Sequence, residues 1–534
     1  MGMFSGNLWF AWALLPGLGI GVFCFFHWRD RQGIQRWATA LLPCLMSVCL
    51  LSLATQWVRA PANSWNGTRL APLMGLKYGY PLYSTIDRGP ILPTIYPPGA
   101  YLPFAPALLA STPTAAILIA ETLVMVYFFL TPSLVLLAGS GQQPGWVVTG
   151  LWGWCCFAGL ALRNATTSYH LSSVHADAPC LAAMGMACAL LYLSKSAPGW
   201  KTLLGSATCA VLAVWCKQTA LPVLVALPLY ILLAWGWRRC VVYTLLIAVV
   251  GALVSAAFVL AIGADVLRWH LITIPGSHSF DPPGLRGIWE AAAKAAPLIR
   301  VPCVLMAGIV IVQCWPRVGR AASSQAWLAE NRWAIFLWLG VFLLPTGLLG
   351  LAKLGGDVNN LHCTYFWICA IVAFVVETVR AEPSAERALP WVRPAVLLVM
   401  LGLTTWGGLR MVRGGLDLPD RLRQLPINPQ QAAYAFAKAH PQQAYFSWNP
   451  LSMLLAEGKL YHHDYAVADW VYAHHPPSRA RLEADFPSAM RWMIIQPIEE
   501  QKYLRRVFPE FSRRVKLDAL PRWPAFEKAE AMHP

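Results

Sequence analysis

The chain has 534 residues, of which 57% are hydrophobic and only 12% are charged, and its mean hydropathy is +0.50. This composition excludes a soluble globule and is typical of an integral membrane protein. The formal charge of +16 would indicate nucleic-acid binding in a soluble protein. Here it comes largely from basic loops and a basic C-terminal tail, which suit lipid headgroups. We therefore predict contacts with membrane lipids and no nucleic-acid partner.

About twelve apolar segments approach the length that a membrane-spanning helix needs. We therefore predict an all-α polytopic transmembrane bundle. The first segment lacks a basic leader and a small-residue cleavage site, so we interpret it as a retained span rather than a signal peptide. The segments lie at 8–26, 38–57, 115–137, 147–162, 179–194, 203–216, 220–236, 240–261, 301–315, 333–352, 362–378 and 394–410.

Basic residues occupy every second loop between these segments. Because Lys and Arg are retained on the cytoplasmic side during insertion, these loops are predicted to be inner. The N-terminus is then outside, as are residues 58–114, 163–178, 262–300, 353–361 and everything after 411. The inner basic residues are Arg29, Arg31, Arg36, Lys195, Lys201, Arg238, Arg239, Arg317, Arg320, Arg332, Arg380, Arg387 and Arg393.

Aspartates gather in the predicted outer loops. Of the six aspartates before residue 411, only Asp30 is on the inner side. Aspartate is nearly neutral in the topology rule, so the clustering needs another reason, and we predict an active site at the outer face. The outer aspartates are Asp87, Asp177, Asp265, Asp281 and Asp357.

The segment 203–236 contains two short apolar runs interrupted by Lys217, Gln218 and Thr219, with no room for a loop. Broken helices at membrane depth are tolerated where they are buried in protein or line a polar cavity. We therefore predict that Lys217 points into an outward-facing cavity.

After Arg413 the chain becomes polar and mixed in charge. We predict a small extracytoplasmic α/β domain at 412–534, following a transmembrane domain at 1–411. Helices are expected at 430–440 and 451–457, and strands at 443–447 and 491–496. All 14 cysteines lie in or beside apolar segments, which excludes a disulfide framework in the outer parts.

Four outer motifs carry chemistry. The first outer loop, 58–100, is predicted to be structured because proline, glycine and aromatic residues are dense in it. It contains Gly79-Tyr80-Pro81-Leu82-Tyr83, Asp87-Arg88-Gly89-Pro90 and Tyr96-Pro97-Pro98. The others are His175-Ala176-Asp177-Ala178-Pro179, Lys217-Gln218-Thr219, and Asp357-Val358-Asn359-Asn360-Leu361-His362.

Together these motifs resemble the C-type (GT-C) superfamily of membrane glycosyltransferases, which includes protein O-mannosyltransferases and bacterial aminoarabinose and mannosyl transferases. The resemblance implies a polyprenyl-phosphate-linked sugar donor, a glycan, lipid or protein acceptor, and a multi-pass protein of the bacterial inner membrane with its active site outside. Members usually carry an acid near the start of the first outer loop, about where this sequence has Asn66. Asp87 is then the only carboxylate in that loop.

Sugar transfer from a lipid phosphate needs a base for the acceptor proton, and positive charge or a metal ion at the departing phosphate. We predict Asp87 as the base and Asp177 as a second carboxylate that orients the acceptor or holds a divalent cation with His175. The metal requirement, Mg²⁺ or Mn²⁺, stays open. We expect Lys217, Arg88 and Arg69 to bind the donor phosphate. The residues predicted to bind sugar or acceptor are Tyr83, Tyr96, His175, Asn359, Asn360 and His362.

Simpler interpretations stay open for these residues. Asp87 would cap a turn and Asp177 the following helix, while Asn360 and His362 would be satisfied polar residues at a span entrance. A transporter or lipid flippase and a structural subunit are alternative functions. A polysaccharide polymerase or ligase is a third, and it would depend on Arg286 and His278 in the later outer loop.

Overall fold

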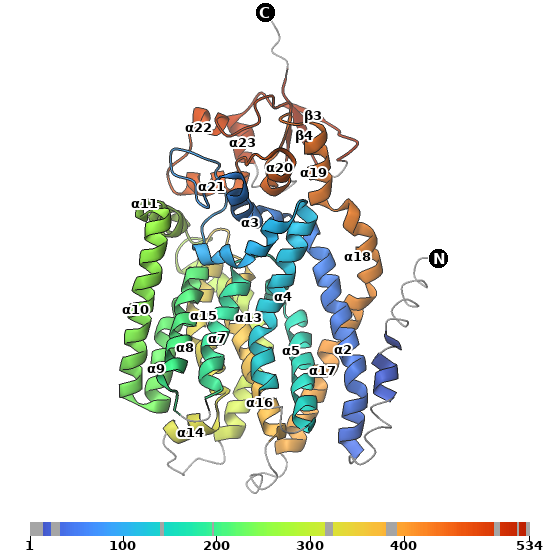
Figure 1. Ribbon diagram of the computed structural model, residues 1–534, viewed down its shortest axis with the longest axis vertical. Coiled ribbons are helices and arrows are strands. Elements are labelled where there is room, and N and C mark those ends of the chain that lie inside the picture. Colours follow the sequence, from blue (N-terminus) through green and yellow to red (C-terminus); the bar gives the residue numbers. More distant parts are fainter. Residues whose placement is uncertain are drawn as a thin grey trace, which may run out of the picture.

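The computed structural model describes residues 14–15, 17–22, 33–138, 144–194, 197–314, 324–380, 392–495, 502–520 and 523–529. Long helices run side by side in one bundle, and the C-terminal part packs against one end of it (Figure 1). We call that end the domain end. The predicted all-α bundle with a small α/β part is confirmed.

Long helices fill the predicted spans. Eight helices of the described ranges are long and apolar enough to cross a membrane, and two further apolar helices, α7 and α8, are shorter. The protein is therefore a multi-pass membrane protein. The first predicted span, 8–26, lies largely outside the described residues. The others correspond to α2 (Gly33–Arg59), α4 (Pro113–Leu137), α5 (Pro144–Arg163), α7 (Asp177–Tyr192), α8 (Trp200–Cys216), α9 (Val223–Trp235), α10 (Trp237–Ile262), α13 (Leu285–Cys314), α15 (Ala334–Ala352), α16 (Cys363–Arg380) and α17 (Val392–Leu416).

Two boundaries differ from the prediction. Helix α13 begins at Leu285, well before the predicted start at 301. Its first turns hold an exposed ion pair, Arg286–Glu290, and several alanines, so this part is helical although it is not apolar. Helix α17 continues to Leu416, so the predicted domain boundary at 411/412 falls inside a helix.

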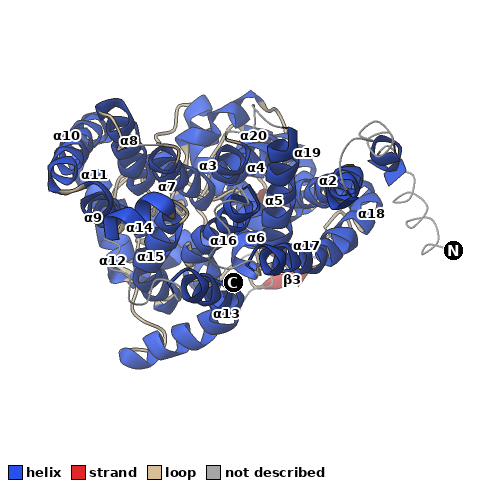
Figure 2. Ribbon diagram, turned by 90° about the horizontal axis from the view of Figure 1, so that it is seen from below, coloured by secondary structure: helices blue, strands red, loops and turns tan. Residues whose placement is uncertain are grey.

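The bundle has a central group of helices and two opposite sides. Seen along the helices, α6 (Ala165–Leu171), α7 and α16 lie in the middle, with α2 and α17 on one side and α10 on the other (Figure 2). Helix α16 is mostly buried, whereas the most apolar stretch of α10 has no buried residue. These burial differences place α16 in the core and leave α10 for lipid contact.

Elements predicted to be outer lie at the domain end. Helices α3 (Ser64–Gly75) and α11 (Ala264–Arg268) are there, while α14 (Ser324–Glu330) lies at the opposite end (Figure 1). The alternation of the loops along the chain therefore agrees with the predicted topology.

The C-terminal part contains a four-stranded sheet of order β1-β2-β4-β3, in which only the β1–β2 pair is parallel. Buried residues Tyr445, Met493 and Phe526 are paired in register across it. The predicted helices and strands are present as α19, α20, β1 and β2. The elements are α18 (Leu418–Gln424), α19 (Pro429–Ala439), β1 (Ala444–Phe446), α20 (Pro450–Glu457), α21 (Asp464–Tyr472), α22 (Arg479–Glu483), β2 (Trp492–Ile494), α23 (Lys502–Val507), β3 (Arg513–Val515) and β4 (Ala525–Glu527).

The first outer loop is held between the bundle and the C-terminal part. Thr68 donates through Oγ1 to the Trp448 carbonyl at 2.7 Å, and the Ile91 amide donates to His462 Nδ1 at 2.9 Å. The loop is therefore ordered by contacts more than 300 residues away in sequence. The cysteines of the described ranges are all free, and most are buried, as predicted for small core residues.

Candidate active site

A buried carboxylate lies at the domain end of the bundle. Helix α7 begins at Asp177, whose side chain is fully buried. Its Oδ1 accepts hydrogen bonds from Lys217 Nζ and His362 Nε2, both at 2.6 Å. Its Oδ2 accepts from His175 Nδ1 at 2.5 Å and from Asn359 Nδ2 at 3.0 Å. These four donors satisfy the charge, as burial of a carboxylate requires.

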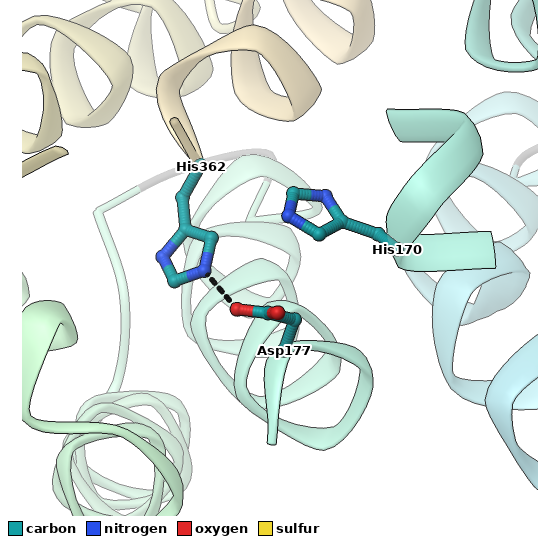
Figure 3. A group of neighbouring side chains, drawn as sticks. All are labelled: His170, Asp177 and His362. Atoms are coloured by element: carbon teal, nitrogen blue, oxygen red, sulfur yellow. Dashed lines mark hydrogen bonds and ion pairs between the residues drawn. The ribbon is translucent and has the colours of Figure 1, made fainter. Parts of the chain in front are cut away.

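Asp177 does not act as the helix cap that its position suggested. The N-cap of α7 is Ala176, and no side chain caps this helix end. The carboxylate instead joins three distant segments, since Lys217 follows α8 and His362 precedes α16. Figure 3 shows Asp177 and His362 facing each other, with His170 of α6 beside them.

The predicted helix interruption positions Lys217. Helix α8 ends at Cys216, Lys217 is extended with φ −152° and ψ 128°, and the chain resumes as the short helix η6 (Gln218–Ala220). Gln218 anchors the interruption by donating to the Ile95 carbonyl at 2.8 Å. Lys217 is only 1% exposed, so its charge depends on the ion pair with Asp177.

A hydrogen-bonded chain leads from Asp177 to Tyr96. Burial lowers the pKa of His175 to about 3, so the imidazole is neutral and carries one N–H. That hydrogen is on Nδ1, because the Asp177 carboxylate only accepts. His175 Nε2 is then the acceptor for the Tyr96 hydroxyl, 3.1 Å away. Tyr96 is only partly buried, so the chain connects the buried carboxylate with a more accessible phenol.

Arg69 supplies a cation with an unused donor. Its Nη2 donates to the Tyr169 hydroxyl at 2.8 Å, while its Nη1 is buried and has no hydrogen-bond partner in the described residues. The guanidinium lies over the Trp65 and Tyr169 rings, 5.5 and 5.9 Å from their centroids. Arg69 is close enough to Asp177 and Tyr96 to interact with both electrostatically. An unsatisfied buried guanidinium N–H is suited to an anionic ligand.

Asn66 has a connecting role at the position where the resemblance predicted an acid. Its side chain is fully buried, donates to the Ala60 carbonyl at 3.0 Å and accepts from the Val174 amide at 2.9 Å. Asn66 thereby joins the first outer loop to the segment that carries His175 and Asp177. The amide supplies a donor and an acceptor at once, which a carboxylate does not.

Three side chains have the spacing of a metal site. One potential ligand atom from each of His170, Asp177 and His362 lies within 4.8 Å of the others, and all three residues are buried. His170 donates through Nε2 to the Asn359 carbonyl, which leaves its Nδ1 without a partner in the described residues. The predicted ligand His175 is outside this triad, because its two nitrogens contact Asp177 and Tyr96.

No protein-family model matches the chain, and no curated protein matches it in sequence. The structure is similar to that of ArnT from Cupriavidus metallidurans bound to undecaprenyl phosphate, with a TM-score of 0.51 and 13% identity over 91% of this chain and 98% of that chain. The chain has the fold of ArnT. The apo state of ArnT from the same organism has a TM-score of 0.49 and 14% identity, over 92% of this chain and 98% of that chain. The fold predicted from the outer motifs is confirmed.

Within this ArnT fold the structure brings most of the predicted site residues together. Tyr83 is buried and positions Tyr96, because its hydroxyl donates to the Tyr96 carbonyl at 2.7 Å. Asn360 points elsewhere and donates to the Asp357 carbonyl. The residues gathered around the carboxylate are Arg69, Tyr96, His175, Asp177, Lys217, Asn359 and His362.

Asp87 and Arg88 lie apart from this group. Both are exposed, and no side-chain hydrogen bond or ion pair in the described ranges joins either one to the cluster. Their loop is held from outside by Arg481, which donates to the Gly89 carbonyl at 2.5 Å. The structure therefore separates the two predicted catalytic carboxylates, one exposed and one buried.

His170 and Tyr169 are site residues that the sequence analysis missed. Both are in α6, inside the predicted outer segment 163–178, but no recognisable motif includes them. The residues of the alternative polymerase mechanism are not in the cluster. Arg286 pairs with Glu290 on the surface, and His278 pairs with Asp469 of the C-terminal part at 3.2 Å.

Proposed function

We propose that the protein is a membrane glycosyltransferase that takes a sugar from a polyprenyl-phosphate donor and transfers it to a glycan, lipid or protein acceptor. The predicted topology supports a location in the inner membrane with the site on the outer face. In this proposal residues 1–411 carry the site and residues 412–534 cover it. Support for the donor class comes from the ArnT fold, since ArnT binds undecaprenyl phosphate.

The observation that carries the proposal is the unpaired Nη1 of Arg69 beside a buried ion pair. Lys217 has three N–H groups and donates one to Asp177, so it also has donors to spare. Both cations lie in a partly desolvated site, where they stabilise a departing phosphate more strongly than they would in water. Asp177 acts in this scheme by holding Lys217, His175 and His362 in position.

Two groups are candidates to accept the proton of the acceptor hydroxyl. Asp87, the predicted base, is exposed and free of ion pairs in the described structure. The second candidate is Tyr96, whose hydroxyl donates to His175 and has its oxygen lone pairs open to an acceptor O–H. Proton transfer through Tyr96 to neutral His175 would be helped by Asp177, which accepts from His175 Nδ1, and opposed by the burial that lowers the pKa of His175.

A divalent cation would bind the triad of His170, Asp177 and His362 through the free His170 Nδ1, and it would replace the hydrogen bond that His362 Nε2 donates to Asp177. Bound there, the cation would add positive charge for the departing phosphate. Imidazole and carboxylate ligands suit Mn²⁺ better than Mg²⁺.

The experiment is sugar transfer or release from a panel of polyprenyl-phosphate sugars by the purified protein in lipid. Arg69→Lys keeps the charge but cannot hold Tyr169 and a phosphate together, so we expect kcat/KM to fall at least tenfold. Arg286→Gln is the control, because that arginine is paired on the surface outside the cluster. Loss of activity in the control with full activity in Arg69→Lys would favour the polymerase or ligase alternative. No turnover with any donor would favour a transporter or structural subunit.

The same assay separates the two base candidates. Asp87→Asn should abolish turnover if the loop carboxylate is the base, and Tyr96→Phe should leave most of it. The reverse result assigns proton transfer to the chain through His175. Tyr96→Phe keeps the ring beside Lys217, 5.8 Å from its Nζ, so it removes only the hydroxyl.

A further inference from the structure

A second polar site lies at the domain end, on the side of the bundle where α2 and α17 meet. It is a small cavity of about 30 Å³, partly open to solvent. Figure 2 shows α2 and α17 together at one side, with α10 opposite and α6 and α16 between. The cavity shares no lining residue with the Asp177 cluster. It is lined by Ser52, Thr55, Gln56, Arg59, Leu162, Arg410, Arg413, Gly414 and Asp417.

The lining residues form two facing polar stripes. On α2 they are Ser52, Thr55, Gln56 and Arg59, which are spaced i, i+3, i+4 and i+7 and so share one helix face. Arg410, Arg413 and Gly414 at the end of α17, with Asp417 just after it, repeat this spacing. Two helices that are otherwise apolar therefore present polar faces to each other.

Direct hydrogen bonds between the stripes do not account for this polarity. Thr55 donates to the Leu51 carbonyl of its own helix, and in the described residues no side-chain hydrogen bond joins α2 to α17 at the cavity. Gly414 lies close to Ser52, so that an added Cβ would be 2.5 Å from the Ser52 hydroxyl oxygen. The helices thus approach closely at the cavity floor and leave its wall polar and open.

The charge of the cavity is strongly positive. Three guanidinium groups face one carboxylate, and none of the three forms a hydrogen bond or ion pair with any residue in the described ranges. Arg59 is attracted by the negative charge of Asp417 and repelled by the positive charges of Arg410 and Arg421. All three arginines are exposed and leave their donors available, so an anion between them would accept charge-assisted hydrogen bonds.

The cavity lies where lipid headgroups are expected. Arg59 and Arg413 lie at the predicted outer ends of α2 and α17. The ends of spanning helices lie at the depth of lipid headgroups, where phosphate groups are abundant.

We propose that this cavity binds the phosphate-bearing headgroup of an anionic phospholipid. Arg59, Arg410 and Arg413 hold the phosphate, for which guanidinium is a good bidentate partner. Ser52 and Gln56 bind the hydroxyl groups of the headgroup, and the acyl chains extend along the lipid-facing sides of α2 and α17. The site is separate from the proposed catalytic site and does not depend on the proposed reaction.

The test is native mass spectrometry of the full-length protein in zwitterionic detergent that contains equal amounts of phosphatidylglycerol and phosphatidylcholine. The measured quantity is the ratio of the two lipids that stay bound to the protein. Wild type should retain phosphatidylglycerol in preference, and Arg410→Gln/Arg413→Gln should lower that preference at least tenfold. The matched control is Arg423→Gln/Arg514→Gln, which removes two exposed arginines of the C-terminal part that do not line the cavity. It should keep the preference of wild type.

Three outcomes would overturn the proposal. The first is an unchanged preference in the cavity variant. The second is an equal loss in the Arg423→Gln/Arg514→Gln control, which would mean general surface attraction. The third is displacement of the bound phospholipid by inorganic phosphate alone, which would mean that the cavity binds free anions. Thermal unfolding of the variants checks that all are folded, and because the replaced arginines are exposed we expect unchanged midpoints.

Discussion

Removing the charge of Asp177 should destabilise the protein through loss of a buried ion pair. Asparagine has one oxygen and one NH₂ group, so Asp177→Asn leaves two of the four donors without an acceptor. Hydrogen bonds to charged groups contribute about 1.5–3 kcal/mol each, so two lost bonds cost about 3–6 kcal/mol. An independent estimate agrees, because removing one partner of a buried ion pair costs about 3–5 kcal/mol. We expect a loss of about 4 kcal/mol.

The assay is the free energy of unfolding from denaturant titration in mixed micelles. Lys217→Met should cost a similar amount, but the double variant should lose at least about 2 kcal/mol less than the sum, because neither charge is then left alone. Asp357→Asn is the matched control, since that aspartate is exposed and only caps a short helix, a role that asparagine fills equally well. Additive losses in the double variant would refute the coupling between Asp177 and Lys217.

Three further predictions concern packing, pH and metal binding. Gly407→Ala should lower the free energy of unfolding by about 1–3 kcal/mol, because the added Cβ would lie 2.7 Å from the Gly159 Cα and push α5 away from α17. Gly408→Ala is the control and should be neutral, because the added Cβ meets open space. Thermal unfolding measures both variants. Burial lowers the pKa of His463 from 6.5 to about 3. The unfolded state therefore binds more protons between those values, and stability rises with pH there and is lost as pH falls. His463→Phe should flatten that dependence by up to about 1.4 kcal/mol per pH unit, and an unchanged slope from pH 4 to 6.5 would contradict it. His170→Asn should weaken Mn²⁺ binding at least tenfold by electron paramagnetic resonance titration, and equal affinity would place the metal elsewhere.

Patterns along the chain were enough to predict the architecture. Apolar segments and alternating basic loops predicted the spans and their order, because each depends on residues that are close in sequence. The same holds for α20, whose Asn449-Pro450 boundary is a local signal. The start of α13 was wrong by sixteen residues, because a helix held by alanine propensity and a surface ion pair does not need an apolar sequence.

The site was predicted only in part. His175, Asp177 and Lys217 stood out because charged and polar residues at the mouth or break of an apolar helix are costly without a purpose. Local sequence also favoured Asp87, yet it could not show that this loop is exposed and turned toward Arg481.

Tertiary structure alone decided which groups meet. Asp177 contacts His362, 185 positions later, and His170 contacts the Asn359 carbonyl, 189 positions later. The α2 and α17 stripes, which lie more than 350 positions apart in the sequence, line one cavity. Side-chain composition along the sequence determined that this chain enters a membrane as a helical bundle, because each segment inserts according to its own hydrophobicity. The identity of each partner depends on how the helices pack, because distances between segments are set by the whole core and not by any segment alone.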